Sequence, residues 1–131
     1  MTRAMSFFLT KQQIIEQTKT VTRRNGWKSL KKGDVLWAVE KAMGLKKGEK
    51  HKRLAQIEII SVYREPLDGI DYIECMLEGF PDFTPKQFIS MYCTANNCPE
   101  NQIVNRIEFK YLENTIDMEE AKCTQVPIRK I

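Results

Sequence analysis

The sequence lacks a long apolar run and is poor in glycine, proline and histidine. No apolar stretch approaches the ~20 residues that cross a bilayer, which argues against a helical membrane protein. Six glycines and five prolines form no Pro/Gly-rich linker or low-complexity tract, so we expect one domain over residues 1–131. The apolar stretch near the N-terminus is too short for a signal-peptide core, which favours a cytoplasmic protein.

Cysteine and histidine are too few for most metal sites. Without an export signal, Cys75, Cys93, Cys98 and Cys123 are expected to be free thiols in a reducing compartment. Cys93 and Cys98 supply at most half of a structural zinc site, which needs four ligands, and the only histidine, His51, lies in a lysine-rich segment. We therefore expect no metal and no cofactor, with structural zinc as the less favoured alternative.

The charge is distributed unevenly along the chain. The net charge is only +4, but residues 1–53 contain 14 Lys and Arg against 4 Asp and Glu, a net of +10, whereas residues 54–131 contain 7 against 13, a net of −6. A block as basic as residues 1–53 attracts polyanions through phosphate contacts and counterion release. The alternative is a solvated lysine-rich surface that serves only solubility.

Hydrophobic periodicity and turn residues predict a mixed α+β domain built on a small barrel of about five strands and two short helices. The predicted strands are 6–9, 20–24, 35–39, 54–63 and 104–112, and the predicted helices are 11–18 and 85–92. Each helix is preceded by a capping-box pattern, Thr10 with Gln13 and Thr84 with Gln87. Residues 40–53 lack a period and are interpreted as a basic loop, and the form of the 113–131 tail is not predicted.

Three segments of the sequence resemble the pattern of ASCH domains. They are Lys19-Thr20-Val21-Thr22-Arg23-Arg24, Leu30-Lys31-Lys32-Gly33-Asp34-Val35-Leu36 and Ile107-Glu108-Phe109-Lys110-Tyr111-Leu112. The resemblance covers about residues 6–112. ASCH domains are similar in fold to PUA domains, so it implies a PUA-like β-barrel whose basic cleft binds RNA or a modified nucleoside. Many small stand-alone members are bacterial or phage-encoded.

The resemblance also implies candidate catalytic residues. One bacterial subgroup of ASCH proteins hydrolyses the amide of N4-acetylcytidine with a lysine, a threonine and a glutamate, and the first two lie in a K-T-x-T-x-R segment. By this match Lys19 is the base, Thr22 the nucleophile and Glu78 the acid, although the match at Glu78 is looser. Burial or a nearby cation lowers the pKa of a lysine enough for it to act as a base. The apolar neighbours of Glu78 favour a protonated carboxyl.

Strand geometry sets a condition on this site. Side chains three positions apart on a regular strand point to opposite faces, so Lys19 must precede the strand. Thr20, Thr22 and Arg24 then share the face that lines the cleft. Each has a simpler alternative, because a lysine often complements a helix end, threonines are common in strands and Glu78 fits a surface ion pair.

Further residues are candidates for ligand binding. Arg23 and Arg24 suit bidentate phosphate binding, and Trp27 is the better candidate to stack on a base, because Trp37 in an apolar strand is expected in the core. The basic residues of the 40–53 loop complete the set: Lys46, Lys47, Lys50, Lys52 and Arg53.

The sequence thus favours a domain that binds RNA or a modified nucleoside. The alternatives are an amidohydrolase of N4-acetylcytidine-like substrates, an RNA-cleaving nuclease and a protein-interaction domain. No membrane and no obligatory protein partner is expected.

Overall fold

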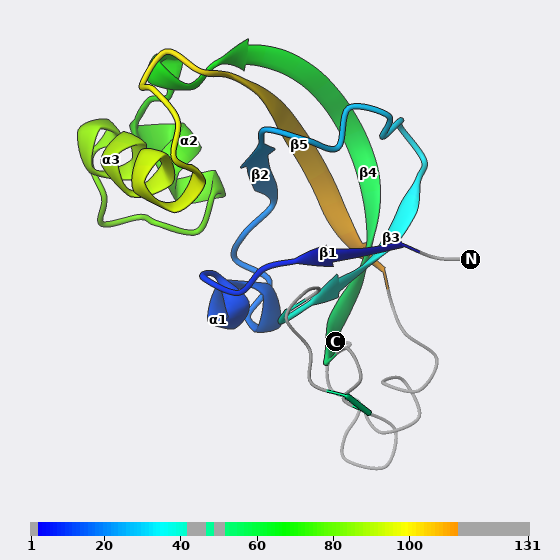
Figure 1. The fold of residues 1–131 in the computed structure, drawn as a ribbon. Coiled ribbons are helices and arrows are strands. Elements are labelled where there is room, and N and C mark those ends of the chain that lie inside the picture. Colours follow the sequence, from blue (N-terminus) through cyan, green and yellow to red (C-terminus); the bar gives the residue numbers. More distant parts are fainter. Residues whose placement is uncertain (1–2, 42–46, 49–51, 113–131) are drawn as a thin grey trace, which may run out of the picture.

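Five strands form one strongly curved sheet, a half-barrel, in the order β1-β3-β4-β5-β2 (Figure 1). The computed structural model describes residues 3–41, 47–48 and 52–112. The strands are β1 (Arg3–Ser6), β2 (Val21–Arg24), β3 (Val35–Val39), β4 (Arg53–Pro66) and β5 (Ile103–Leu112). β1 pairs with β3 in parallel and the other pairs are antiparallel. The predicted α+β class with five strands is confirmed.

Three short α-helices and one 3-10 turn accompany the sheet in the described ranges. They are α1 (Lys11–Ile15), η1 (Leu67–Gly69), α2 (Tyr72–Leu77) and α3 (Pro85–Asn96). The capping box of α3 is formed as predicted: the Thr84 hydroxyl accepts from the backbone N–H of Gln87, and the Gln87 side chain accepts from that of Thr84. The C-terminal cap after α3, Asn97, adopts a left-handed conformation with φ 51°.

The segment before β2 differs from the prediction. β1 ends at Ser6 instead of continuing to Leu9, because Phe7 turns into the core while Phe8 and Leu9 are exposed. α1 ends at Ile15 and its predicted capping box is absent. The amide of Gln13 donates instead to the backbone carbonyl of Gly79, 3.0 Å away, and so ties α1 to the end of α2.

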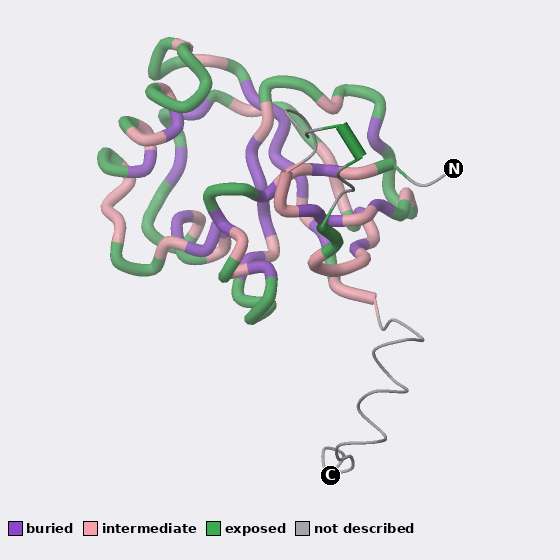
Figure 2. The backbone as a smooth tube through the Cα atoms, turned by 60° about the horizontal axis from the view of Figure 1, so that its bottom comes forward, coloured by how far each residue is buried: buried purple, intermediate pink, exposed green. Residues whose placement is uncertain are grey.

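Two apolar clusters hold the described residues together, and buried segments run along the strands and the inner faces of the helices (Figure 2). The larger cluster lies between α1 and the sheet and contains Phe7, Ile14, Ile57 and Phe109. The smaller cluster packs α2 and α3 against the start of β5 and includes Phe88. Burying each large apolar side chain contributes roughly 1.5–3 kcal/mol.

Trp37 was expected in the core but lies outside it. Its side chain is only half-buried, and the Arg53 guanidinium lies 4.4 Å from the centroid of its ring. The reason is strand alternation, because Leu36 and Ala38 on either side of Trp37 are the residues that point inward. Among the described helices, none has the length and apolar character needed to span a membrane.

Candidate functional site

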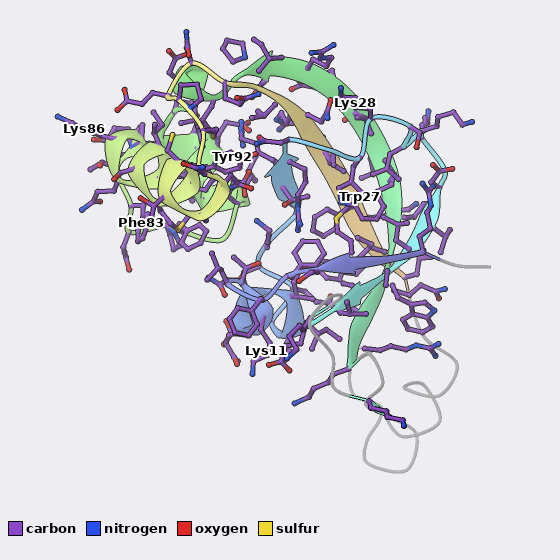
Figure 3. All side chains as sticks on the ribbon, in the orientation of Figure 1. Lys11, Trp27, Lys28, Phe83, Lys86 and Tyr92 are labelled. Carbon is purple, nitrogen blue, oxygen red and sulfur yellow. The ribbon has the colours of Figure 1, made fainter. Side chains whose placement is uncertain are left out.

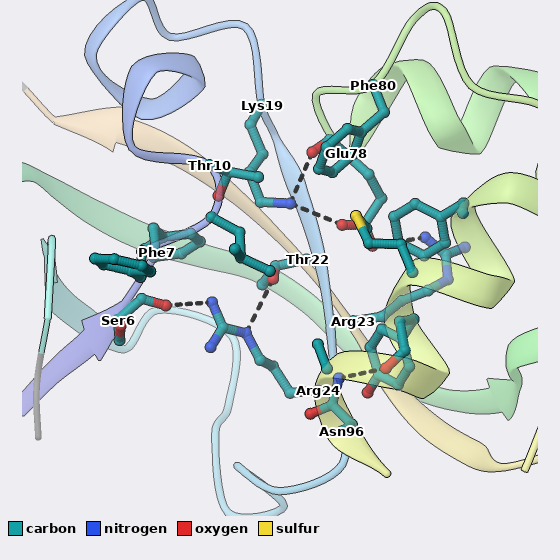
Figure 4. A pocket seen from close by; sticks show the side chains of 16 residues that line it. Ser6, Phe7, Thr10, Lys19, Thr22, Arg23, Arg24, Glu78, Phe80 and Asn96 are labelled. Carbon is teal, nitrogen blue, oxygen red and sulfur yellow. Dashed lines mark hydrogen bonds and ion pairs between the residues drawn. The ribbon is translucent and has the colours of Figure 1, made fainter. Parts of the chain in front are cut away.

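A cavity of about 230 Å³ lies where the two apolar clusters meet (Figure 4). It is lined by Ser6 at the end of β1 and residues 7–10 after it, by Lys19 and three residues of β2, by Glu78 and Phe80 after α2, and by one face of α3. Its aromatic wall therefore comes from both clusters, Phe7 from one and Phe88 from the other. A space of this size accommodates a single base or nucleoside more readily than a larger ligand.

Lys19 and Glu78 form a buried ion pair at this cavity. The Lys19 ammonium donates to Oε1 of Glu78 at 2.7 Å and to the backbone carbonyl of the same residue at 2.8 Å. Both side chains are only 3% exposed. Lys19 precedes β2 as predicted, and its backbone carbonyl accepts a hydrogen bond from the Tyr111 hydroxyl. Hydrogen bonds at both the backbone and the ammonium of Lys19 thus fix the position of its side chain.

Thr22 is held by Arg24 in the same cavity. Its hydroxyl oxygen accepts a hydrogen bond from Nε of Arg24 at 3.0 Å, and Arg24 Nη2 donates to the backbone carbonyl of Ser6 at 2.7 Å. Thr22 is 3% exposed. In the described residues no hydrogen bond joins Thr22 to Lys19, although both face the cavity (Figure 4). An apo site often shows such contacts only after ligand binding.

Arg23 points to a different set of partners and is not free to grip phosphate as predicted. Its guanidinium, 1% exposed, donates to Glu78 at 3.0 Å, to Glu65 at 2.8 Å and to Glu74 at 2.7 Å. The Nε atom of Arg23 is buried without a partner in the described structure. Glu74 also accepts two hydrogen bonds from Arg106. Arg23 therefore serves as the centre of a buried ionic network.

This network changes the setting predicted for Glu78. The sequence predicted apolar surroundings that favour a protonated carboxyl, but the two oxygens of Glu78 accept from two cationic side chains, Lys19 and Arg23. The expected apolar environment is wrong because Arg23 reaches Glu78 from β2, 55 residues away along the chain. Glu78 is the C-terminal cap of α2, directly before the turn at Gly79.

Burial lowers the pKa of two of the three cations that line the cavity, Lys19 and Arg24. Burial lowers the pKa of Lys19 below its ordinary value, and the attraction of Glu78 opposes this only in part. Burial likewise lowers the pKa of Arg24. Burial alone would lower the pKa of Arg23 as well, but Glu78, Glu74 and Glu65 outweigh it and the pKa is raised. A neutral amine is therefore more accessible at Lys19 than at an exposed lysine.

Other predicted ligand residues do not line the cavity. Thr20 is half-buried directly before β2, where its backbone N–H donates to the carbonyl of Leu77 and its carbonyl accepts from the N–H of Phe109. Trp27 packs partly buried against the larger apolar cluster, and its ring lies 5.8 Å from the Arg3 guanidinium. In Figure 3, Trp27 is well separated from Tyr92 on α3.

The structure describes only part of the basic loop at residues 40–53. Lys47 is exposed, the Lys52 ammonium lies 3.6 Å from a carboxylate oxygen of Glu40, and Arg53 covers Trp37. None of these three lines the cavity. Lys46 and Lys50, together with His51, lie outside the described residues.

Several cavity residues were not predicted. Thr10 caps α1 and is buried, but its side chain makes no capping hydrogen bond. Phe88 and Tyr92 lie in the predicted helix 85–92, where apolar periodicity does not distinguish packing from cavity lining. Burial raises the pKa of the Tyr92 hydroxyl, which donates to the side-chain oxygen of Asn25 at 2.7 Å.

The cysteines fall outside this arrangement. Cys75, Cys93 and Cys98 are free thiols, whereas Cys123 lies beyond the described residues. Residues 3–41, 47–48 and 52–112 contain no group of three or more His, Cys, Asp or Glu side chains placed to hold a metal ion.

Comparison with known proteins relates this chain to others through its structure. No family model and no curated protein matches the sequence. A protein of Enterococcus faecalis V583 from the family DUF984 superposes with a TM-score of 0.62 at 14% identity, over 86% of this chain and 80% of that one. The ASCH domain from Lactobacillus crispatus JV V101 superposes with a TM-score of 0.57 at 17% identity, over 83% and 78% respectively. This chain therefore has the ASCH-like fold that its sequence motifs predicted.

Proposed function

We propose that this chain binds a base-modified nucleoside in the cavity and hydrolyses an amide bond of it, with N4-acylated cytidine as the substrate class implied by the resemblance. One observation carries the proposal: a hydroxyl, a buried amine and a carboxylate, those of Thr22, Lys19 and Glu78, face one cavity of nucleoside size. A hydroxyl, a base and an orienting group are the parts that acyl transfer needs.

The hydrogen bond from Arg24 to Thr22 directs the chemistry of the hydroxyl. Because Oγ1 of Thr22 already accepts from Arg24, its own proton is free for a base, and Lys19 in its neutral form is the amine that shares the cavity. Glu78 orients that amine by accepting a hydrogen bond from it.

The reaction then balances in two steps. Oγ1 of Thr22 attacks the acyl carbon and gives its proton to Nζ of Lys19, which passes it to the leaving amine as the C–N bond breaks. Water, deprotonated by Lys19, attacks the resulting threonyl ester, and the carboxylic acid is released as the Thr22 hydroxyl re-forms. The surrounding aromatic side chains keep other water away from the ester.

The test is turnover of N4-acetylcytidine by the purified protein, followed by chromatography. Thr22→Ala should lower the rate by about a thousandfold, because it removes the nucleophile. Lys19→Met should cause a comparable loss. Thr94→Ala, an exposed threonine of α3, is the matched control and should keep the wild-type rate. Unchanged turnover in Thr22→Ala would contradict this proposal.

Binding of RNA is a second candidate, favoured by the net charge of +10 over residues 1–53 and by the exposed Lys47. Polymer contacts would lie outside the cavity, which is too small for more than one base. If RNA binds, its affinity measured by fluorescence anisotropy should fall steeply with salt and with the double charge reversal Lys47→Glu, Lys52→Glu. Salt-independent binding would count against it, and cleavage of the RNA would instead indicate a nuclease.

A further inference from the structure

Arg24 is a half-buried cation without a carboxylate partner among the described residues. Its two hydrogen bonds go to neutral acceptors, the hydroxyl of Thr22 and the backbone carbonyl of Ser6. In the described part of the chain no aspartate or glutamate forms an ion pair with it. The flat ring of Phe7, 4.8 Å from the guanidinium carbon, is the other favourable contact.

The neighbouring arginines show how unusual this is within the same molecule. Arg23, the preceding residue of β2, pairs with three glutamates, and Arg106 on the adjacent strand pairs with Glu74 and Glu108. A buried charge is normally paired, because burial without an opposite charge is costly. Arg24 alone of these three forms no ion pair with a described carboxylate.

The remaining nitrogen of Arg24 is available to a ligand. Nη1 makes no hydrogen bond to any described residue, the side chain lines the cavity, and Figure 4 shows this third nitrogen without a partner beside the two that are bonded. Arg23 Nε is the one buried side-chain polar atom that lacks both a partner and solvent in the described structure, so Nη1 of Arg24 is not sealed off. The cavity thus presents a free guanidinium donor.

The position of this donor indicates which part of a ligand it meets. Nε of Arg24 is 3.0 Å from Oγ1 of Thr22, so a carbon attacked by that oxygen, and the chain attached to the carbon, lies beside the guanidinium. The acyl side of a substrate is therefore nearer to Arg24 than the base or sugar. On the basis of the function proposed above, we propose that the preferred ligand has a carboxylate on its acyl group, as a succinyl-type amide does, and that Arg24 binds this carboxylate.

The first experiment tests anion binding without any catalysis. Succinate, its neutral diamide succinamide, and inorganic phosphate are titrated into the protein, and the Nε–H resonance of Arg24 and the melting temperature are followed. Succinate should shift both and succinamide neither, because only the former brings charge. Thr22→Ala should still bind succinate, so that this result stands apart from the failure or success of hydrolysis.

Variants assign the effect to Arg24. Arg24→Gln should weaken succinate binding at least tenfold, Arg24→Lys should weaken it less, and Arg3→Gln, an exposed arginine that pairs with Asp34, should leave it unchanged. If Arg24→Gln fails to fold, the Arg24 resonance of the wild type and the Lys variant still decide the question. Equal effects of succinate and succinamide would overturn the proposal, and tighter binding of phosphate than of succinate would overturn the carboxylate assignment.

The second experiment compares N4-succinylcytidine with N4-acetylcytidine as substrates. A KM at least tenfold lower for the succinyl compound, lost in Arg24→Gln, is expected. An equal KM for both, with Arg24→Gln lowering only kcat, would assign the guanidinium to the oxyanion of the tetrahedral intermediate and would overturn the proposal.

Discussion

Adjacent residues of β2 have opposite electrostatic surroundings although they share one residue type. Arg23 is locked among Glu65, Glu74 and Glu78, whereas Arg24 on the other face bonds only to neutral oxygens. Strand alternation is the cause, because successive side chains leave the sheet on opposite sides. A single step along the chain thus separates a structural cation from one that faces the candidate ligand.

Removal of the Glu78 carboxylate tests the buried pair. Glu78→Gln leaves the Lys19 ammonium buried without its anion, so the free energy of unfolding should fall by about 3 kcal/mol at pH 6. The loss should be smaller at pH 9: without Glu78 the pKa of Lys19, already lowered by burial, falls further and the amine becomes neutral. Urea unfolding at both pH values measures this.

The control is the double variant Lys19→Met, Glu78→Leu, which replaces both charges by apolar groups. It should lose less stability than Glu78→Gln, because it leaves no unpaired charge. Equal losses for Glu78→Gln at pH 6 and pH 9 would show that Lys19 does not set the cost.

Elements with a strong local signal were predictable, and those fixed by distant contacts were not. β3 has the predicted bounds, β5 begins one residue earlier than predicted, and the capping box of α3 formed. α2, with six residues, is too short to show a helical period and went unpredicted. The ionic network around Arg23 could not be predicted from the sequence either. Glu65 and Glu74 are 42 and 51 residues away from Arg23, and no local sequence pattern pairs them with it.

The candidate site likewise contains residues that the sequence predicted and residues that it did not. The motif resemblance selected Lys19, Thr22 and Glu78, which the structure brings to one cavity, while their catalytic roles stay predictions. The aromatic wall and Thr10 were missed because only the fold brings residues 6–10 opposite α3.

The turn between α2 and α3 depends on Gly79. Its φ of 98° is rare for other residues, and a Cβ there would lie 2.9 Å from Cγ of Gln13 and 3.4 Å from Cβ of Lys19. Gly79→Ala should therefore cost about 2 kcal/mol of stability and displace Lys19, lowering any turnover. Gly26→Ala, where nothing lies within 4 Å, is the matched control. Chemical denaturation compares the two, and similar stabilities would contradict the expectation.

At the scale of the whole molecule, ionic contacts join the helical part to the sheet. Glu74 of α2 accepts from Arg106 of β5 at 2.8 and 3.0 Å and from Arg23 of β2 at 2.7 Å. The hydrogen bond from Arg106, followed by that from Arg23, outweighs burial and lowers the pKa of Glu74 below 4.5. Because the cavity lies between the two apolar clusters, a ligand bound there should further stabilise their contact.

Acid should loosen this connection. A carboxyl with a lowered folded pKa contributes stability above its unfolded value of 4.5, and that contribution is lost as the pH falls through the folded value. Between pH 6 and pH 3 the wild type should lose more stability than Glu74→Gln, so that the two curves converge. Glu100→Gln, at an exposed position, should follow the wild type. Parallel curves for wild type and Glu74→Gln would contradict this.

The register of the pairing between β4 and β5 shifts between Ile59 and Ser61, so the alternation of inward and outward side chains changes within the longest strand. Before it, the inward positions of β4 are Ile57 and Ile59; after it, Val62 faces Ile107, and Tyr63 is 49% exposed. Ile60 is the residue of β4 that has no partner in β5 at this shift, as the extra residue of a β-bulge has none. If Ile60 were instead paired in a regular ladder, every later residue of β4 would change face, so that Tyr63 would turn inward and Val62 outward over the half of the sheet that supports the helices.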